Sequence, residues 1–188
     1  MFAQMGLTST NVSTINFGGY RLDNVVSASR MFAGCYNLHR EALTNLSNMT
    51  LQNCNKCFYM FEGNNRTATT STTLDLSGLK LANNADVSYM FYYCPYKVID
   101  IHNLDTTIKY SNVEAMFNYN KQLTTIYCNV DMTKQSSGSS AKTAFVGCST
   151  QLKGGKGTAW ATSRTQVTYA KPDKGGTSSS TRGYFTTK

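Results

Sequence analysis

A Met-Phe dipeptide recurs along the chain at a nearly constant interval, and this repeat limits the folds that the sequence can adopt. It occupies residues 1–2, 31–32, 60–61, 90–91 and 116–117, and Ala144-Phe145 is a related sixth copy. Successive copies are 30, 29, 30, 26 and 28 residues apart. Such a period is typical of proteins built from stacked units, in which each unit buries its apolar side chains against its neighbours.

Each unit divides into two parts with different hydrophobic periods. Segments 86–91 and 111–117 place a valine three residues before Met, behind an Asp or Asn that can cap a helix, and we expect one or two helical turns there. Alternating runs at 15–17, 74–76, 99–101 and 126–128 predict very short strands. Such strands gain stability when they pair in parallel with the next unit, about 4.8 Å away. The sequence therefore predicts an α/β solenoid, with a parallel sheet along one side and short helical turns along the other.

The repeat also predicts what fills the core and where the stack ends. We expect about five units in residues 1–152, with Leu76, Ile101 and Ile126 pointing inward. One buried column should contain Phe32, Phe61, Phe91 and Phe117. Residues 153–188 should form a C-terminal cap, because the end of a stack exposes apolar side chains and an unpaired strand edge. The side chains expected to cover the last unit are Trp160, Val167, Tyr169, Tyr184 and Phe185.

The six cysteines fit buried free thiols better than a disulfide scaffold. One repeat position, three residues after Phe, alternates between cysteine and asparagine: Cys35, Asn64, Cys94, Asn120 and Cys148. Cysteines of this column would lie two units, about 10 Å, apart, which exceeds the Cα separation of a disulfide. Cys54-x-x-Cys57 could be a redox pair or half of a zinc site, but no second Cys-x-x-Cys or histidine pair accompanies it. We interpret Cys57 as a core residue, in the place that Val87 and Val113 take in later units.

Positive charge is concentrated near the C-terminus. Residues 1–132 hold nine basic and nine acidic groups, whereas residues 133–188 hold nine basic groups and one acidic group. A patch that could attract an acidic polymer would contain Lys153, Lys156, Lys171 and Lys174. The alternative is a basic terminus that only improves solubility.

Residue types suited to catalysis are sparse. His39 and His102 lie in different units, and the sequence contains no motif of a serine hydrolase, a zinc protease or a phosphate-binding loop. Asp75 and Asp100 hold the same outward strand position in consecutive units, which would place two carboxylates about 5 Å apart. Such a pair could bind a cation or raise one pKa, although a solvated pair is the simpler interpretation.

Tyrosines outside the Met-Phe register are candidates for binding, because tyrosine offers a large contact area at a small entropic cost. They are Tyr89, Tyr92, Tyr93, Tyr96, Tyr119 and Tyr127. Some of these rings should pack in the core. The candidate partner-binding set is Tyr92, Tyr93, Tyr96 and Tyr127, together with Asp75 and Asp100.

The repeat resembles the BspA-like leucine-rich repeats of bacterial surface proteins. The resemblance rests on Met-Phe-x-x-Cys, on strands such as Leu-Asp-Leu-Ser at 74–77, and on Asn-Val before the next Met-Phe. Residues 154–158 (Gly-Gly-Lys-Gly-Thr), 168–173 (Thr-Tyr-Ala-Lys-Pro-Asp) and 183–186 (Gly-Tyr-Phe-Thr) also look like the terminal series of such proteins. The units are longer than the usual two dozen residues, and Lys-Pro at 171–172 departs from the common pattern. The resemblance implies a right-handed leucine-rich-repeat stack, export and adhesion.

These features predict a non-enzymatic surface module that presents a repeat face to a protein or glycan partner. The alternatives are a structural spacer of a longer surface protein, the receptor-binding module of a phage particle, and a glycan-active enzyme. We expect a monomer with no cofactor, no metal and no specific nucleic-acid partner. No apolar run reaches about 18 residues, so we expect no transmembrane segment in this chain. An extracellular or envelope-attached location would place the signal and the anchor outside this chain.

Overall fold

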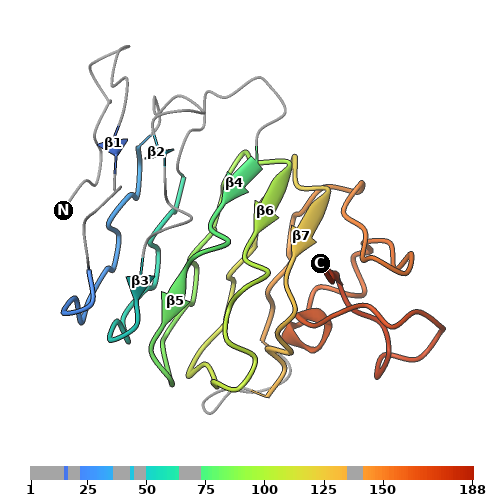
Figure 1. Cartoon of the computed structure of the whole chain (residues 1–188). Coiled ribbons are helices and arrows are strands. Elements are labelled where there is room, and N and C mark those ends of the chain that lie inside the picture. The colour runs from blue at the N-terminus through green and yellow to red at the C-terminus, as the bar shows by residue number, and fades with distance from the viewer. Residues whose placement is uncertain (1–14, 17–21, 36–42, 45–49, 64–72, 135–141) are drawn as a thin grey trace.

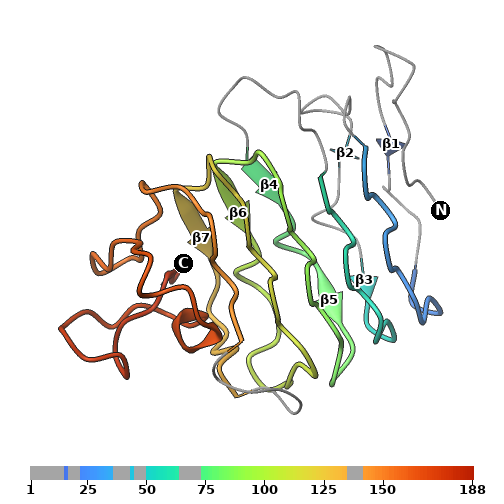
Figure 2. The same cartoon turned by 180° about the vertical axis from the view of Figure 1, so that it is seen from behind.

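The computed structural model describes residues 15–16, 22–35, 43–44, 50–63, 73–134 and 142–188 of the chain. Its units lie side by side in chain order from β1 to β7, and the C-terminal segment lies beyond β7 (Figures 1 and 2). The elements are β1 (Ile15–Asn16), β2 (Leu43–Thr44), β3 (Thr50–Leu51), β4 (Thr73–Asp75), β5 (Lys80–Leu81), β6 (Val98–Asp100), β7 (Thr125–Tyr127), η2 (Val167–Tyr169) and β8 (Phe185–Thr186).

The strands form parallel sheets between successive units. Among the described residues, two sheets have two strands, β1-β2 and β3-β5, and the third has four strands in the order β4-β6-β7-β8. All of these pairs are parallel, and Leu74, Ile99, Ile126 and Phe185 are aligned across the large sheet. The predicted short parallel strands are confirmed, one residue earlier than expected in β4, β6 and β7. Leu76, Ile101 and Ile126 are fully buried, as expected of inward side chains.

The predicted helical turns are absent from the described residues, where the single helical element is the three-residue 3-10 helix η2. Hydrogen bonding around Phe32 shows the reason. The N–H groups of Arg30, Phe32 and Gly34 donate to carbonyls of the next unit at 2.8 to 3.1 Å, while the N–H groups between them close tight turns three residues back. An α-helix needs these donors for its own carbonyls four residues back. The Met-Phe side is therefore a second ladder of backbone hydrogen bonds, which connects each unit to the next.

The capping signals that suggested helices form isolated turns instead. Asp86 accepts a hydrogen bond from the Ser88 N–H at 2.9 Å, and Asn112 accepts one from the Glu114 N–H at 3.1 Å. Each turn is followed directly by a residue with positive φ, at Tyr89 (55°) and Ala115 (52°). A left-handed residue ends a right-handed helical run, so the chain turns without continuing as a helix.

The core is built around the predicted column of phenylalanines. Phe32, Phe61, Phe91, Phe117 and Phe145 are all fully buried. Their rings stack in that order, with centroid separations of 5.2, 5.7, 5.5 and 5.5 Å. The column contacts the sheet side through Phe117 and Phe185, whose centroids are 5.9 Å apart. The predicted column is confirmed, and Phe145 extends it by one ring.

Residues 153–188 pack over the end of this column. Strand β8 pairs with β7, and the Tyr184 ring meets the Phe145 ring edge to face at 4.8 Å. The Trp160 indole N–H donates to the Phe145 carbonyl at 2.8 Å. All five side chains expected to cover the last unit lie in the hydrophobic core or against it. The division of the chain at residue 152 stays a prediction.

The six cysteines are free and buried, as predicted. In the alternating column, the Cys94 thiol donates to the Phe61 carbonyl at 2.9 Å, and the Cys148 thiol donates to the Phe117 carbonyl at 3.1 Å. The Asn120 side chain accepts a hydrogen bond from the Cys94 N–H at 2.6 Å. Thiol and amide thus satisfy backbone groups of the adjacent units. Asn64 lies outside the described residues.

Candidate functional site

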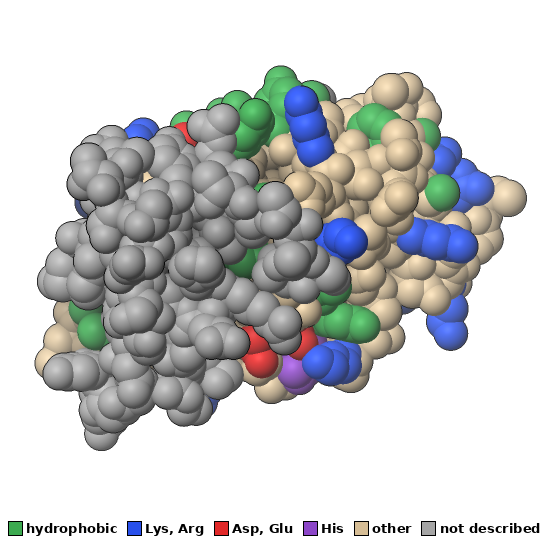
Figure 3. Space-filling model, turned by 90° about the horizontal axis from the view of Figure 1, so that it is seen from above, with side chains coloured by type: hydrophobic (Ala, Val, Ile, Leu, Met, Phe, Trp, Pro, Cys, Tyr) green, Lys and Arg blue, Asp and Glu red, His purple; other side chains and the backbone are tan. Residues whose placement is uncertain are grey.

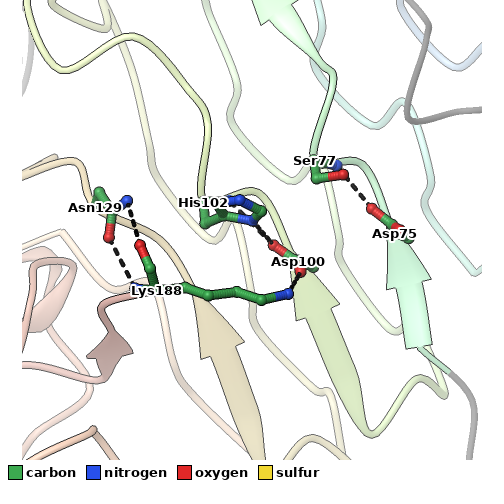
Figure 4. A network of polar contacts seen from close by, with 6 residues as sticks. All are labelled: Asp75, Ser77, Asp100, His102, Asn129 and Lys188. Carbon is green, nitrogen blue, oxygen red and sulfur yellow. Dashed lines mark hydrogen bonds and ion pairs between the residues drawn. The ribbon is translucent and has the colours of Figure 1, made fainter.

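The paired aspartates of the sheet occupy different environments. Asp75 and Asp100 are in register on β4 and β6, as the repeat predicted. Asp75 is exposed and accepts a hydrogen bond from the Ser77 N–H at 2.9 Å. Asp100 is only 4% exposed, so the expectation of a solvated outward side chain is wrong for this residue. The cause of its burial is contact with His102 and Lys188 (Figure 4).

Both carboxylate oxygens of Asp100 are engaged. Oδ1 lies 2.6 Å from His102 Nδ1, and Oδ2 accepts a hydrogen bond from Lys188 Nζ at 2.6 Å. Burial alone would raise the pKa of Asp100, but the hydrogen bonds from Lys188 and His102 outweigh it and lower that pKa. The idea that the aspartate pair raises one pKa is therefore wrong for Asp100. A cation could bind there only by breaking an ion pair that the protein already makes.

Lys188, the last residue of the sequence, is bonded to residues of this sheet and of the segment after β7. Its N–H donates to Asn129 Oδ1, and its carbonyl accepts a hydrogen bond from Asn129 Nδ2, both at 3.2 Å. Its ammonium lies 4.8 Å from the centre of the Tyr127 ring. Tyr127, one of the candidate binding residues, thus already contacts a cation from its own chain. We interpret the Asp100, His102, Lys188 and Asn129 network as a tie between the C-terminal segment and the sheet.

The remaining candidate tyrosines separate into buried and exposed rings. Tyr96 is 5% exposed, so its proposed role in partner binding is wrong: its side chain belongs to the core. Tyr93 is 37% exposed and Tyr119 is 39% exposed, and both are among the large apolar side chains most accessible to solvent in the described part of the chain. Tyr92 lies between them in space and is half-buried.

Five rings form a continuous surface cluster on the Met-Phe side, which we call the tyrosine strip: Tyr59, Tyr89, Tyr92, Tyr93 and Tyr119. Tyr59 stacks on Tyr89 with centroids 4.5 Å apart, and Tyr89 meets Tyr92 at 5.6 Å. Tyr92 meets Tyr119 edge to face at 5.5 Å and Tyr93 at 6.4 Å. The strip therefore crosses three successive units.

Arg30 extends the strip at the end nearer the N-terminus. Its guanidinium lies 4.6 Å from the centre of the Tyr59 ring and pairs with Glu62 at 3.8 Å. Sequence reasoning missed both Arg30 and Tyr59. The repeat register could have found them, because Tyr59 and Tyr89 both stand directly before Met-Phe, and Arg30 holds the same place one unit earlier.

At the other end, a pocket of about 190 Å³ opens beside the strip. It is lined by Tyr93, Cys94, Pro95, Tyr119, Lys121 and Gln122. Its mouth therefore combines two exposed rings with a cationic and an amide side chain. Such a mixture of apolar and hydrogen-bonding groups suits a side chain or chain end of a partner.

The pKa values of two hydroxyl groups of the strip, those of Tyr59 and Tyr92, are raised, which favours their protonated form. Burial, followed by the neighbouring ring of Tyr89 and the charge of Glu62, raises the pKa of Tyr59. Burial and the ring of Tyr119 likewise raise the pKa of Tyr92. Neutral phenols can donate hydrogen bonds as well as accept them.

The lysines of the predicted polyanion patch lie in the C-terminal segment. Lys153, Lys156 and Lys174 are exposed, whereas Lys171 is half-buried and donates to the Ser179 carbonyl at 2.8 Å. Figure 3 shows acidic side chains, a histidine and a Lys or Arg side chain together at one edge of the molecule, and further Lys and Arg side chains spread over the part away from the grey residues. A role of these lysines in binding a polyanion stays a prediction.

Comparisons with models of protein families, with curated proteins and with solved structures found no match to this chain. The resemblance to BspA-like repeats therefore rests on the motifs of the sequence alone. Within the described residues, no helix is both long and apolar enough to cross a membrane. No group of three or more potential metal-ligating side chains occurs in the same part of the chain.

Proposed function

We propose that this protein is a non-enzymatic binding module that recognises a protein partner through the tyrosine strip. In this proposal the stacked units form a right-handed, leucine-rich-repeat-like solenoid of an exported or envelope-attached protein. The supporting observations are the repeat, the motifs shared with BspA-like surface proteins, and the extended aromatic surface. Solenoids commonly bind through such long surfaces.

The observation that carries the proposal is the backbone conformation of the strip. Tyr59, Tyr89, Tyr93 and Tyr119 all have positive φ, between 55° and 62°. This conformation costs a bulky L-residue roughly 1–2 kcal/mol, a strain that glycine avoids. Glycine does stand at the position of Tyr93 and Tyr119 in other units, as Gly34, Gly63 and Gly147. Tyrosine at strained positions where glycine fits points to a role for the side chain itself.

The arrangement of the rings favours a protein over a glycan. Sugars bind tyrosine by lying against a free ring face. Here Tyr59 is sandwiched between Arg30 and Tyr89, and Tyr119 packs against Gly147, where an added Cβ would lie 2.7 Å from the ring. Ring edges and hydroxyl groups remain for contact, which suits the backbone and side-chain groups of a protein surface. A wide, rigid tyrosine surface is also typical of protein-recognition sites.

The test is a binding screen of residues 1–188 against arrays of extracellular-matrix proteins and of glycans, at low and at physiological salt. The decisive variant is Tyr89→Asn/Tyr119→Asn, because asparagine tolerates positive φ and removes only the rings. We expect protein binding that persists at physiological salt and weakens at least about tenfold in this variant, a loss of roughly 1.4 kcal/mol.

Two control variants separate the strip from other surfaces. Tyr127→Asn removes a tyrosine of β7 and should leave binding unchanged. Lys153→Ala/Lys156→Ala reduces the basic charge and should matter only for binding that salt already abolishes. Three results would contradict the proposal: binding to glycans alone, equal binding by the wild type and the Tyr89→Asn/Tyr119→Asn variant, and no binding at either salt concentration. The last result would favour a structural spacer.

A further inference from the structure

Cys54 and Cys57 lie at the corner of one unit, between β3 and the start of the Met-Phe side. The Cys54 N–H closes a tight turn onto the Leu51 carbonyl at 2.8 Å. Lys56 then forms isolated parallel bridges with Ser27 and Asp86 in the units on either side. The chain around the two cysteines is thus held by backbone bonds to its neighbours.

The two sulfur atoms face each other in this corner. Cys54 Sγ and Cys57 Sγ are 2.8 Å apart, and both residues are fully buried. A disulfide needs about 2.05 Å, so the sulfurs would approach by only roughly 0.8 Å on bond formation. Each of the six thiols has a carbonyl oxygen as an acceptor, including Lys56 for Cys54 and Cys54 for Cys57, so the feature that distinguishes this pair is that its two sulfurs face each other.

We propose that Cys54 and Cys57 are a redox-active pair that closes to an intra-unit disulfide when the protein meets a low-molecular-weight disulfide. In the first step the Cys54 thiolate attacks one sulfur of that disulfide, forms a mixed disulfide and releases one thiolate. In the second step Cys57 loses its proton and attacks the Cys54 sulfur, which releases the second thiolate. The protein loses two electrons and two protons, and the small disulfide is reduced to two thiols.

The local environment assigns the two cysteines different roles in this exchange. The hydrogen bond from Cys57 lowers the pKa of Cys54 to about 7, against the opposing effect of burial and with help from backbone groups of Lys56 and Ala28. The same hydrogen bond, together with burial, raises the pKa of Cys57. Since the thiolate is the attacking species, Cys54 is the nucleophile and Cys57 the resolving thiol.

Access is controlled by the fold. Both thiols are buried, but Asn53, Asn55 and Lys56, which flank them in the chain, are exposed. Exchange therefore requires a local opening of this corner, so we expect it to be slower than reaction of an exposed thiol. Cys57 fills the core position that Val87 and Val113 fill in later units, and the disulfide leaves its sulfur in that place.

The experiment equilibrates the full chain with mixtures of reduced and oxidised glutathione, blocks the remaining thiols with N-ethylmaleimide in denaturant, and digests with trypsin. Cleavage after Lys56 separates the two cysteines into peptides 41–56 and 57–66. We expect these two peptides to be found joined by a disulfide, with the other four cysteines blocked. If trypsin does not cut the closed loop, peptide 41–66 should be two hydrogens lighter than its reduced form.

The same titration in urea measures how much the folded structure favours formation of the disulfide. We expect the native protein to form the bond at a ratio of oxidised to reduced glutathione at least about tenfold lower than the unfolded chain. By thermodynamic linkage, the oxidised protein is then more stable to unfolding by about 1.4 kcal/mol for each such factor of ten.

Matched variants identify the pair. Cys54→Ser should leave five blocked cysteines at every ratio, whereas Cys128→Ser should keep the link between 41–56 and 57–66. The proposal is overturned if the native wild-type protein keeps six blockable thiols at the most oxidising ratio, if the link joins other cysteines, or if the native and urea titrations coincide. The wild-type titrations decide the matter even where a variant fails to fold.

Discussion

Gly147 tests the geometry of the tyrosine strip most directly. It has φ of +65°, and a Cβ added to it would lie 2.7 Å from Tyr119 Cδ1 and 3.1 Å from Cε1. Gly147→Ala therefore has two separate costs. The left-handed backbone costs roughly 1–2 kcal/mol for a non-glycine residue. Displacing the Tyr119 ring adds roughly 1–3 kcal/mol, the usual range for overpacking.

The two costs can be separated by a double-mutant cycle. In a Tyr119→Asn background the ring is gone, while asparagine accepts the φ of 62° at this position. There Gly147→Ala should cost only the backbone part, roughly 1–2 kcal/mol. The coupling between the two sites should therefore be roughly 1–3 kcal/mol.

Urea unfolding followed by the fluorescence of Trp160 is a suitable assay. It is the single tryptophan, and it bonds to the carbonyl of Phe145, two residues before Gly147. Gly157→Ala is the matched control, because Gly157 has φ of +98° but the added Cβ would lie 3.8 Å from its neighbour Lys153 Cε, an ordinary contact distance. If Gly147→Ala costs the same with and without the Tyr119 ring, that ring does not lie over Gly147, and the argument for a protein partner loses its geometric support.

Three further predictions concern the core and the C-terminal segment. Phe91→Ala should lower the free energy of unfolding by roughly 3–5 kcal/mol and Phe91→Leu by less than about 1.5 kcal/mol; equal effects in chemical denaturation would speak against a stacked column. Gly183→Ala places a Cβ against the Lys171 carbonyl oxygen, so it should destabilise by roughly 1–3 kcal/mol or more, and an unchanged melting temperature would refute the close contact. Asp173 is buried, which favours a higher pKa, but hydrogen bonds from Thr158 and backbone N–H groups outweigh burial and lower its pKa. Asp173→Asn should therefore destabilise by roughly 1.5–3 kcal/mol at neutral pH. The carboxylate's contribution is lost as pH falls from about 4 through its lower folded-state pKa, so urea titrations should show the difference from wild type shrinking there, and a constant difference would contradict the assignment.

The features that the sequence predicted are those that depend on the repeat itself. The Phe column and the strands at β4, β6 and β7 follow from residues that recur at the same place in each unit, and stacking converts that recurrence into contact. The prediction of helical turns was wrong because the capping signals at Asp86 and Asn112 each form a turn but do not suffice to start a helix. Each forms its turn, and the N–H groups that would continue a helix bond to the next unit instead.

The errors at the candidate site have a different cause. Asp100 is buried because Lys188, which is 88 residues away in the chain, reaches back across β7. The strand pattern around Asp100 contains no sign of that contact. Tyr93 ends a turn and Tyr96 lies three residues later in the irregular segment before β6, yet Tyr93 is exposed and Tyr96 is in the core. A short irregular segment has no fixed period, so residue type alone did not separate them.

The strained tyrosines and the missing helices are two consequences of one backbone arrangement. The N–H of each strained tyrosine donates to a carbonyl of the next unit: Tyr59 to Ser88, Tyr89 to Glu114, Tyr93 to Asn118 and Tyr119 to Val146, at 2.7 to 3.1 Å. The ladder therefore fixes the left-handed conformation at these positions whichever residue occupies them, and glycine, alanine, arginine and tyrosine all occur there. Side chains at these positions can vary from unit to unit while the backbone stays the same. A binding surface can arise on such a scaffold through side-chain choice alone, and four of the five tyrosines of the strip stand at these positions.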